Sequence, residues 1–325
     1  MKYFSNSLTR NIITKNILKK IIPIKLRRFI LININKDNSI KLYYGNNVAI
    51  IDNKYKKIEG LIPVYYYDDV SNFGDLVGPY LISKITGKPV INIRNSKYPG
   101  IMAVGSILNT INRNNMVVWG SGLIGEPTDE FMEKLRKYDP KFLSVRGLET
   151  AKLLSEANIN IPGRHVYGDP ALILPLFYTP STHSSKEIGI CPHYIHKSHF
   201  LENINKKEWL KIIDVQEDME SVVDSIVSSS VCISTSLHGL IIAQAYGIPW
   251  VWLEIVDDNL TGRDFKFRDF FSTIDISQVT HIKSTMEKVK DLDFEAIAQS
   301  ATLPNKLYDE VAILEAFKEY IELDD

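Results

Sequence analysis

The sequence predicts an α/β fold of two Rossmann-like domains that face a cleft, and three observations favour this fold. Short apolar runs alternate with longer helical patterns from residue 41 onward, as expected for parallel strands joined by helices. Small and polar residues repeatedly follow the apolar runs, at the strand ends where doubly wound sheets bind ligands. The length of 325 residues suits two domains, and the Pro- and Ser-rich stretch Pro175–Ser185 is the best linker between them.

The first forty residues differ from the rest of the chain in charge. They carry nine Lys or Arg and one Asp, so their net charge is +8 while the remainder carries −9. Ile13, Ile17 and Ile21 recur at helical spacing until Pro23 ends the pattern. A basic amphipathic helix of this kind can lie on an anionic membrane surface, and a poorly ordered basic tail is an equal alternative.

No uncharged apolar run is long enough to span a membrane or to form the core of a signal peptide. We therefore expect a cytoplasmic protein, peripheral to the inner face of the cytoplasmic membrane if the basic helix forms. The two cysteines, Cys191 and Cys232, show no metal-binding spacing. They suit a reducing compartment and two structural thiols better than a disulfide.

We place the first domain at residues 41–180. Leu61–Tyr67 is a continuous apolar and aromatic run, typical of a buried strand. The other predicted strands are Ile101–Val104, Met116–Trp119, Lys141–Val145 and His165–Tyr167, and the predicted helices are Leu76–Thr86, Pro127–Tyr138 and Leu148–Ala157.

We place the second domain at residues 181–325, where the same alternation begins again. Its predicted strands are Glu187–Cys191, Val231–Ser234 and Trp250–Ile255, and its predicted helices are Asp218–Ser228 and Leu237–Tyr246. The last helical pattern, Glu310–Glu322, could pack on either domain.

The segment Ser234–Gly239 lies at the turn between a predicted strand and a predicted helix. Thr235 or Ser236 would take the N-cap role, and His238 would fall in the first helical turn, where unpaired amides favour an anion. The alternative is a capping turn whose histidine satisfies a buried carbonyl. Gly239 weakens a helix by about 1 kcal/mol relative to alanine, which favours close approach of backbone or ligand.

Eight short motifs occur in a fixed order over roughly residues 60–275. They are Asn72-Phe-Gly-Asp75, Gly105-Ser-Ile-Leu108, Trp119-Gly-Ser-Gly122, Val145-Arg-Gly147 with Thr150, Tyr167-Gly-Asp-Pro170, Pro192-His193, Ser236-Leu-His-Gly239 with Tyr246-Gly-Ile-Pro249, and Phe265-Lys-Phe267 with Asp269. This ordered set resembles the polysaccharide pyruvyl transferases. Each motif is short, and the specificity comes from their order and spacing.

The resemblance implies a fold similar to that of GT-B glycosyltransferases, with the active site between an acceptor-side first domain and a donor-side second domain. It implies phosphoenolpyruvate as donor and, as acceptor, a hydroxyl pair on a sugar of a surface polysaccharide or its lipid-linked precursor. The product would be a cyclic pyruvate ketal. General acid and base groups with anion holders suffice for this reaction, so we expect no metal or redox cofactor.

The resemblance also assigns roles to catalytic residues. His238 matches the donor-site histidine, as phosphate ligand or proton donor, and Arg146 matches an arginine used on the donor. The alternative for Arg146 is a surface arginine that packs on Glu149. Asp75 would take a proton from the acceptor hydroxyl, or would cap the helix predicted to begin at Leu76.

In some family members the residue two before the histidine is an arginine, and here it is Ser236. Cations after the strand Trp250–Ile255 could restore the charge, and of these Lys266 matches the family pattern. The predicted donor-binding residues are Ser236, Leu237, Gly239, Lys266, Arg263 and Arg268. The predicted acceptor-binding residues are Asn72, Ser121 and His193. We expect Asp169 to fix a turn.

His193, His196 and His199 invite a zinc interpretation. They follow a predicted strand and not a helix start, and no Cys or carboxylate completes a ligand set, so we predict no metal site. Two other functions remain open. A GT-B nucleotide-sugar glycosyltransferase would need an acidic residue for a ribose, for which Glu254 is the candidate. A non-catalytic binding protein would explain Ser236.

Overall fold

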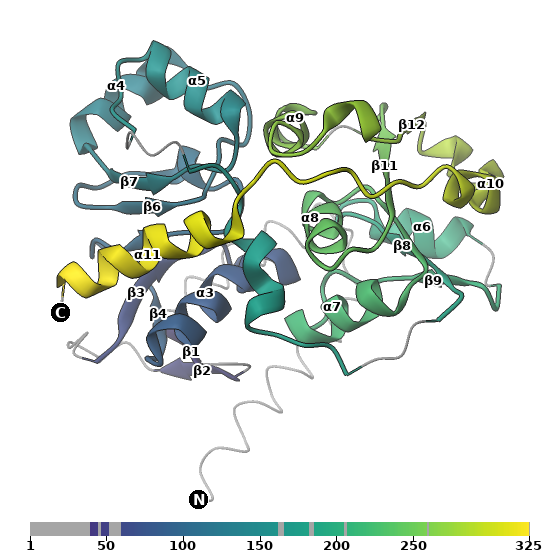
Figure 1. Cartoon of the computed structure of the whole chain (residues 1–325), viewed down its shortest axis with the longest axis horizontal. Helices are drawn as coiled ribbons and strands as arrows, with labels where there is room; N and C mark the ends of the chain where they lie inside the picture. The colour runs from purple at the N-terminus through teal and green to yellow at the C-terminus, as the bar shows by residue number, and fades with distance from the viewer. Residues whose placement is uncertain are drawn as a thin grey trace, which may run out of the picture.

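The computed structural model describes residues 40–44, 47–51, 60–161, 166–181, 185–204, 207–258 and 260–324. The predicted basic arm, apart from its last residue, and the start of the predicted strand His165–Tyr167 lie outside the described residues. The chain forms an α/β fold with two sheets, each flanked by helices (Figure 1), as the alternation of apolar runs and helical patterns predicts. No described helix is long and apolar enough to cross a membrane.

The first sheet has the strand order β2-β1-β4-β3-β5-β6-β7. Its strands are β1 (Ile40–Tyr44), β2 (Asn47–Ile51), β3 (Ile62–Tyr65), β4 (Val90–Asn92), β5 (Ile101–Met102), β6 (Val117–Trp119) and β7 (Lys141–Ser144). Five of them, from β4 to β7, run parallel, and β1 and β2 extend the sheet as an antiparallel pair. The helices of this half are α3 (Phe73–Thr86), α4 (Asp129–Tyr138) and α5 (Leu148–Glu156), with η1 (Leu108–Thr110) and η2 (Pro170–Leu176).

The second sheet is parallel throughout, in the order β12-β11-β10-β8-β9. Its strands are β8 (Ile188–Cys191), β9 (Leu210–Ile212), β10 (Val231–Ser234), β11 (Trp250–Ile255) and β12 (His281–Ser284). Its helices are α6 (Lys197–Asn203), α7 (Met219–Ser228), α8 (Leu237–Ala245), α9 (Phe265–Phe271), η3 (Ile276–Gln278), η4 (Glu287–Asp291) and α10 (Phe294–Gln299), and α11 (Glu310–Asp324) ends the chain.

Several predicted boundaries differ from those of the structure by two or three residues, and two of the differences lie near the candidate site or the predicted linker. Helix α3 begins at Phe73, three residues before the predicted Leu76, because the extended backbone of Asn72 ends there and Phe73 is already buried. The predicted linker does not begin at Pro175, since Pro175 and Leu176 still belong to η2, most of which lies in the core.

The helix α11 packs on the first half, which decides between the two positions that its sequence pattern left open. Figure 1 shows the chain returning from the second sheet so that α11 lies across the first. The indole Nε1 of Trp119 donates a hydrogen bond to the carbonyl of Ile313 (2.8 Å), and its ring stacks on Phe317 with centroids 4.4 Å apart.

The two halves share one hydrophobic core. A single cluster of buried side chains includes Val77 of α3, Ile173 of η2, Leu240 of α8 and Phe317 of α11. Separate clusters cover the other face of each sheet. Since buried apolar area is the main favourable term in folding, the shared core holds the two sheets in a fixed relation and brings their carboxyl edges together.

Candidate functional site

Loops from the carboxyl ends of both sheets meet in close contacts that only glycine permits. A Cβ on Gly74 would collide with the ring of His238, and a Cβ on Gly147 would collide with the backbone of Asp269. Gly125 and Gly262 likewise touch each other, one from each half. The backbone of the first half therefore lies directly against α8, α9 and the loop before α9.

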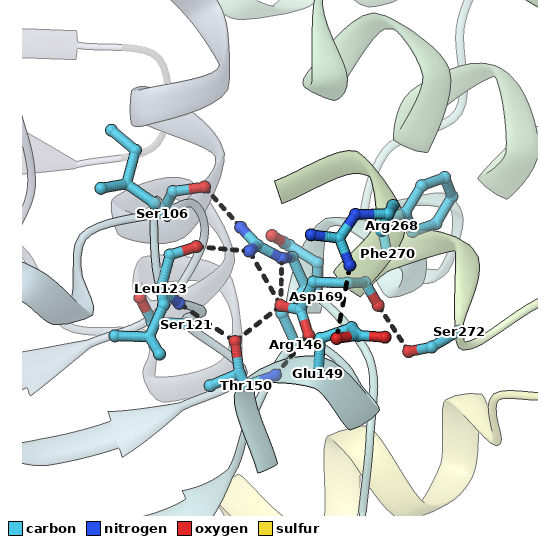
Figure 2. A network of polar contacts seen from close by, with 12 residues as sticks. Ser106, Ser121, Leu123, Arg146, Glu149, Thr150, Asp169, Arg268, Phe270 and Ser272 are labelled. Atoms are coloured by element: carbon cyan, nitrogen blue, oxygen red, sulfur yellow. Dashed lines mark hydrogen bonds and ion pairs between the residues drawn. The ribbon is translucent and has the colours of Figure 1, made fainter. Parts of the chain in front are cut away.

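A buried ion pair joins the two halves (Figure 2). The guanidinium of Arg146, which follows β7, donates from Nε to Oδ2 of Asp269 on α9 (2.8 Å), and a terminal nitrogen of the guanidinium lies 2.8 Å from the same oxygen. Thr150 adds two hydrogen bonds to the same carboxylate, from its amide (2.8 Å) and from its hydroxyl (2.7 Å). Both charged side chains are fully buried.

Arg146 makes two further hydrogen bonds, to the carbonyl of Leu123 (2.6 Å) and to the hydroxyl of Ser106. The alternative of a surface arginine packing on Glu149 is wrong, because Arg146 has no exposed surface. Arg268 contacts Glu149 instead, at 3.5 Å. Arg146 is thus a fixed positive charge whose donors are directed mainly to the protein.

The turn before α8 leaves the start of that helix without a side-chain cap. Ser236 occupies the N-cap position, as predicted, but its hydroxyl makes no capping hydrogen bond. The hydroxyl of Thr235 instead accepts from the amide of His193 (2.8 Å). Within the described part of the chain, no acceptor pairs with the amides of Leu237 and His238, so they keep their capacity to bind an anion.

His238 lies between the two halves with its ring almost completely buried. It is 9% exposed, and its Nε2 has no hydrogen-bond partner in the described residues. The ring meets the edge of Phe73 with centroids 6.3 Å apart. Burial lowers the pKa of His238 to about 3, and the charges of Lys266 and Arg146 add to this shift, so the imidazole is neutral at neutral pH.

Among the charged side chains near His238, Lys266 on α9 has the largest effect on the pKa of the imidazole. It is 8% exposed, and it makes no hydrogen bond or ion pair with any other described residue. Burial lowers the pKa of Lys266 to about 8, with Arg146 adding to the shift and Asp75 opposing it. Burial, followed by the charge of this ammonium, lowers the pKa of His193 to about 2.

Asp75 faces Lys266 from the first half. Burial raises the pKa of Asp75 to about 7, against the opposing effects of the Asn72 hydrogen bond and of Lys266. The amide nitrogen of the Asn72 side chain donates to Oδ2 of Asp75 at 2.9 Å. The predicted cap of a helix starting at Leu76 is wrong, because Asp75 lies inside the first turn of α3.

The structure thus brings together Asn72, Asp75, Arg146, His193, Ser236, Leu237, His238, Gly239 and Lys266. It places three other predicted residues elsewhere. Ser121 is fully buried and donates to the carbonyl of Gly105 (2.9 Å). Arg268 pairs with Asp264 (3.1 Å), and Arg263 lies at the exposed edge of a small pocket beside Trp252.

The three spaced histidines follow a strand, β8, as predicted, but they also straddle the start of helix α6, which was not predicted. His196 is the residue before α6, and its Nδ1 lies 2.9 Å from the hydroxyl of Thr235. Its Nε2 lies 3.0 Å from the carbonyl of Asp258. Within the described ranges, no group of three His, Cys, Asp or Glu side chains is arranged to hold a metal ion.

Two carboxylates near the site have structural roles. Asp169 fixes a turn, as predicted: its carboxylate accepts from the amide of Ala171 (3.0 Å) and from that of Gly105 (3.1 Å). Asp269 had no predicted role. The sequence does contain a sign that Asp269 has a structural role. It is a carboxylate within the aromatic segment Phe265–Phe271, and a buried carboxylate must be paired.

Comparison with known proteins agrees with the ordered motifs. A family model described as polysaccharide pyruvyl transferase matches residues 18–257. An uncharacterized protein of Acanthamoeba polyphaga mimivirus is 28% identical over 257 residues, which cover 74% of this chain and 86% of that protein. The family match includes Asp75, Arg146 and His238, and it ends before Lys266 and Asp269.

The buried ion pair gives a stability prediction. Replacing Arg146 by Met leaves the Asp269 carboxylate buried without its cation, so we expect the free energy of unfolding to fall by about 3–5 kcal/mol, measured by urea denaturation. The matched control is Arg268→Met, whose exposed pairs contribute about 0–1 kcal/mol. The double variant Arg146→Met/Asp269→Leu should recover much of the loss. Equal effects of Arg146→Met and Arg268→Met would contradict this account.

Proposed function

Because the chain belongs to the polysaccharide pyruvyl transferase family, we propose that it transfers the enolpyruvyl group of phosphoenolpyruvate to a sugar and forms a cyclic pyruvate ketal. The acceptor would be a sugar of a surface polysaccharide or its lipid-linked precursor. One observation carries the proposal: the buried ammonium of Lys266 forms no ion pair with any side chain of the described residues, and it lies with His238 beside the uncapped start of α8. This combination favours a small, multiply charged anion.

The site is consistent with a GT-B arrangement in which donor and acceptor meet between the two carboxyl edges. Lys266 and the first amides of α8 would hold the phosphate and carboxylate of the donor. Lys266 would also supply the cation that Ser236 lacks, which removes the argument for a non-catalytic protein. The structure argues against the glycosyltransferase alternative, which needs Glu254 to bind the ribose of a nucleotide sugar. Glu254 already pairs with His281 (2.7 Å) and Lys283 (3.4 Å).

In net, the proposed reaction moves two protons from the sugar hydroxyls. A proton is added to the methylene carbon of phosphoenolpyruvate, which gives an oxocarbenium-like centre at C2. One sugar hydroxyl forms a C–O bond there and loses its proton to Asp75. The C–O bond to phosphate breaks, and the second hydroxyl closes the ring. The two hydroxyl protons end on the new methyl group and on the released phosphate, so atoms and charges balance.

His238 is suited to carry the proton to carbon. Its imidazole is neutral while only the cations Lys266 and Arg146 act on it. A bound trianion reverses the sign of the local charge, which raises the pKa of the histidine. Donor binding would therefore load His238 with a proton in a site where general acid catalysis contributes about 10²–10⁴ in rate.

Donor binding is tested by thermal unfolding. Phosphoenolpyruvate should raise the melting temperature, whereas nucleotide sugars should not. At a phosphoenolpyruvate concentration of one hundred times its Kd, binding stabilises the folded state by about 2.7 kcal/mol. Lys266→Met and His238→Ala should abolish the shift, whereas Lys283→Met, on the exposed strand β12, should keep it. Stabilisation by a nucleotide sugar and not by phosphoenolpyruvate would overturn the proposal.

The charges of Asp75 and Lys266 predict the pH dependence of kcat/KM. Asp75 must be ionised to act as a base, so activity should rise as pH increases through about 7. Lys266 must be protonated to hold the donor, so activity should fall as pH increases through about 8. We therefore expect the plot of kcat/KM against pH to be a narrow bell-shaped curve, with kcat/KM measured from the rate of phosphate release.

Two variants separate the limbs of this profile. Lys266→Arg keeps a positive charge at high pH and should move the alkaline limb upward while retaining donor binding. Asp75→Asn should remove most of the activity at every pH while leaving the phosphoenolpyruvate-induced shift in melting temperature in place. A pH profile that Lys266→Arg leaves unchanged would refute the role of Lys266.

We also propose that the protein acts at the inner face of the cytoplasmic membrane through residues 1–40, which lie almost wholly outside the described residues. Their net charge of +8 supports contact with anionic lipid. The full chain should sediment with phosphatidylglycerol vesicles at low salt, and less so at high salt. If a chain without residues 1–40 sediments equally well, the membrane proposal is wrong.

A further inference from the structure

The first half contains a pocket of about 310 Å³ that the proposed reaction leaves unused. One wall is formed by η1 and the turn after it, with Asn109 and Asn112, and the other by helix α4, with Phe131, Lys134 and Tyr138. Pockets that bind small molecules commonly enclose about 300–1,000 Å³. This pocket therefore has the size of a site for a small ligand.

Helix α4 contributes two aromatic rings to the pocket. Phe131 and Tyr138 are seven residues apart on this helix, a spacing that places them on one face. Both rings are half-buried and pack against the core cluster that includes Leu135. Because the core holds each ring from one side, the aromatic wall is a fixed apolar surface.

Three polar groups of the lining have no hydrogen-bond partner within the described part of the chain. The side-chain oxygen of Asn109 accepts from the amide of Ile124 (2.8 Å), which leaves its Nδ2 unused. The side-chain oxygen of Asn112 accepts from Nε of Arg113 (2.7 Å), and its Nδ2 is likewise unused. The hydroxyl of Tyr138 is the third group. Each of these groups can donate a hydrogen bond to a ligand.

The lining of the pocket carries no net charge. Its two ionised side chains, Glu130 and Lys134, pair with each other one turn apart on α4 at 2.6 Å. Unlike the surroundings of Lys266, the pocket thus has no buried cation to attract an anion. Aromatic rings, amide donors and a phenol in a neutral pocket suit a ligand that has both hydroxyls and an apolar C–H face, as an uncharged sugar does.

One peptide unit joins the pocket to the proposed catalytic groups. The carbonyl of Leu123 accepts from Arg146 (2.6 Å), and the amide of Ile124, in the same peptide unit, donates to Asn109. The carbonyl and amide of a trans peptide point in opposite directions, so Arg146 and Asn109 lie on opposite sides of this unit. Ser106, three residues before Asn109, also contacts the guanidinium (Figure 2). A ligand in the pocket would therefore lie close to the site around Arg146.

We propose that this pocket binds an uncharged sugar of the acceptor chain, other than the sugar that receives the pyruvate. Phe131 and Tyr138 would pack on the C–H face of the ring, and Asn109 and Asn112 would donate to its hydroxyls. The inference rests on the proposed transfer to a saccharide. It adds a substrate contact that shares no residue with the groups proposed to hold the donor.

The experiment measures saccharide binding to the full chain by saturation-transfer NMR. The probes are the methyl glycosides of glucose, galactose and mannose, with glucose 1-phosphate as the anionic comparison. Tyr138→Ala and Asn112→Ala should each weaken binding of the preferred hexoside, the former by about tenfold. Asn109→Asp keeps the oxygen that accepts from Ile124, loses the donor and should also weaken binding. The control is Lys137→Ala, exposed on the same helix and outside the pocket, which should have no effect.

Donor binding is followed in the same samples by the phosphoenolpyruvate-induced shift in melting temperature, which every pocket variant should retain. The inference is overturned if no hexoside binds, or if Tyr138→Ala and Asn109→Asp bind hexosides as the original chain does. It is also overturned if glucose 1-phosphate binds more tightly than the hexosides, which would make the pocket an anion site. If the original chain does not respond to phosphoenolpyruvate, the proposed function fails, whereas hexoside binding that depends on Tyr138 would still support a saccharide site here.

Discussion

The buried pair of Arg146 and Asp269 is the interaction on which the site depends. Removing the two ions from water costs several kcal/mol for each. Hydrogen bonds offset part of that cost, because Thr150 donates to the Asp269 carboxylate and Arg146 donates to the carbonyl of Leu123. The pair fixes α9 against the first half, and Lys266 lies three residues before Asp269 on that helix. A charge bridge between the halves therefore sets the position of the ammonium proposed to hold the donor.

Burial is the main cause of the depressed pKa values of Lys266 and His238, and the arginine of the pair adds to it. Although Arg146 is bound to a carboxylate, its charge still lowers the pKa of both groups after burial has done so. Cations buried near each other, with an ammonium that forms no ion pair among the described residues, are electrostatically unfavourable until an anion binds. Groups kept in such an environment are characteristic of functional sites, because binding relieves the unfavourable interaction.

Much of the fold could be predicted because it depends on local patterns. Apolar runs ending in glycine-containing turns identified β3, β6, β7, β10 and β11, and helical spacing identified α4, α5, α7 and α8. The short strands β9 (Leu210–Ile212) and β12 (His281–Ser284) have mixed composition, and only pairing with a neighbouring strand makes them strands.

Site residues could likewise be predicted where a local pattern marks them, and not where a distant residue is their partner. The first turn of α8 could be located from sequence, whereas the partner of Arg146 lies 123 residues away, and no local pattern indicates such a pairing. Ser121 resembled a cleft residue because its loop is polar, but its hydroxyl is used within the core.

The proposed site cannot exist in either half alone. His238 and Lys266 come from the second sheet's helices, yet Gly74 and Gly105 of the first half lie against the imidazole, and Asp75 supplies the opposing carboxylate. The shared core and the glycine contacts make docking of the halves part of folding, so the burial that shifts these pKa values is present before any ligand arrives.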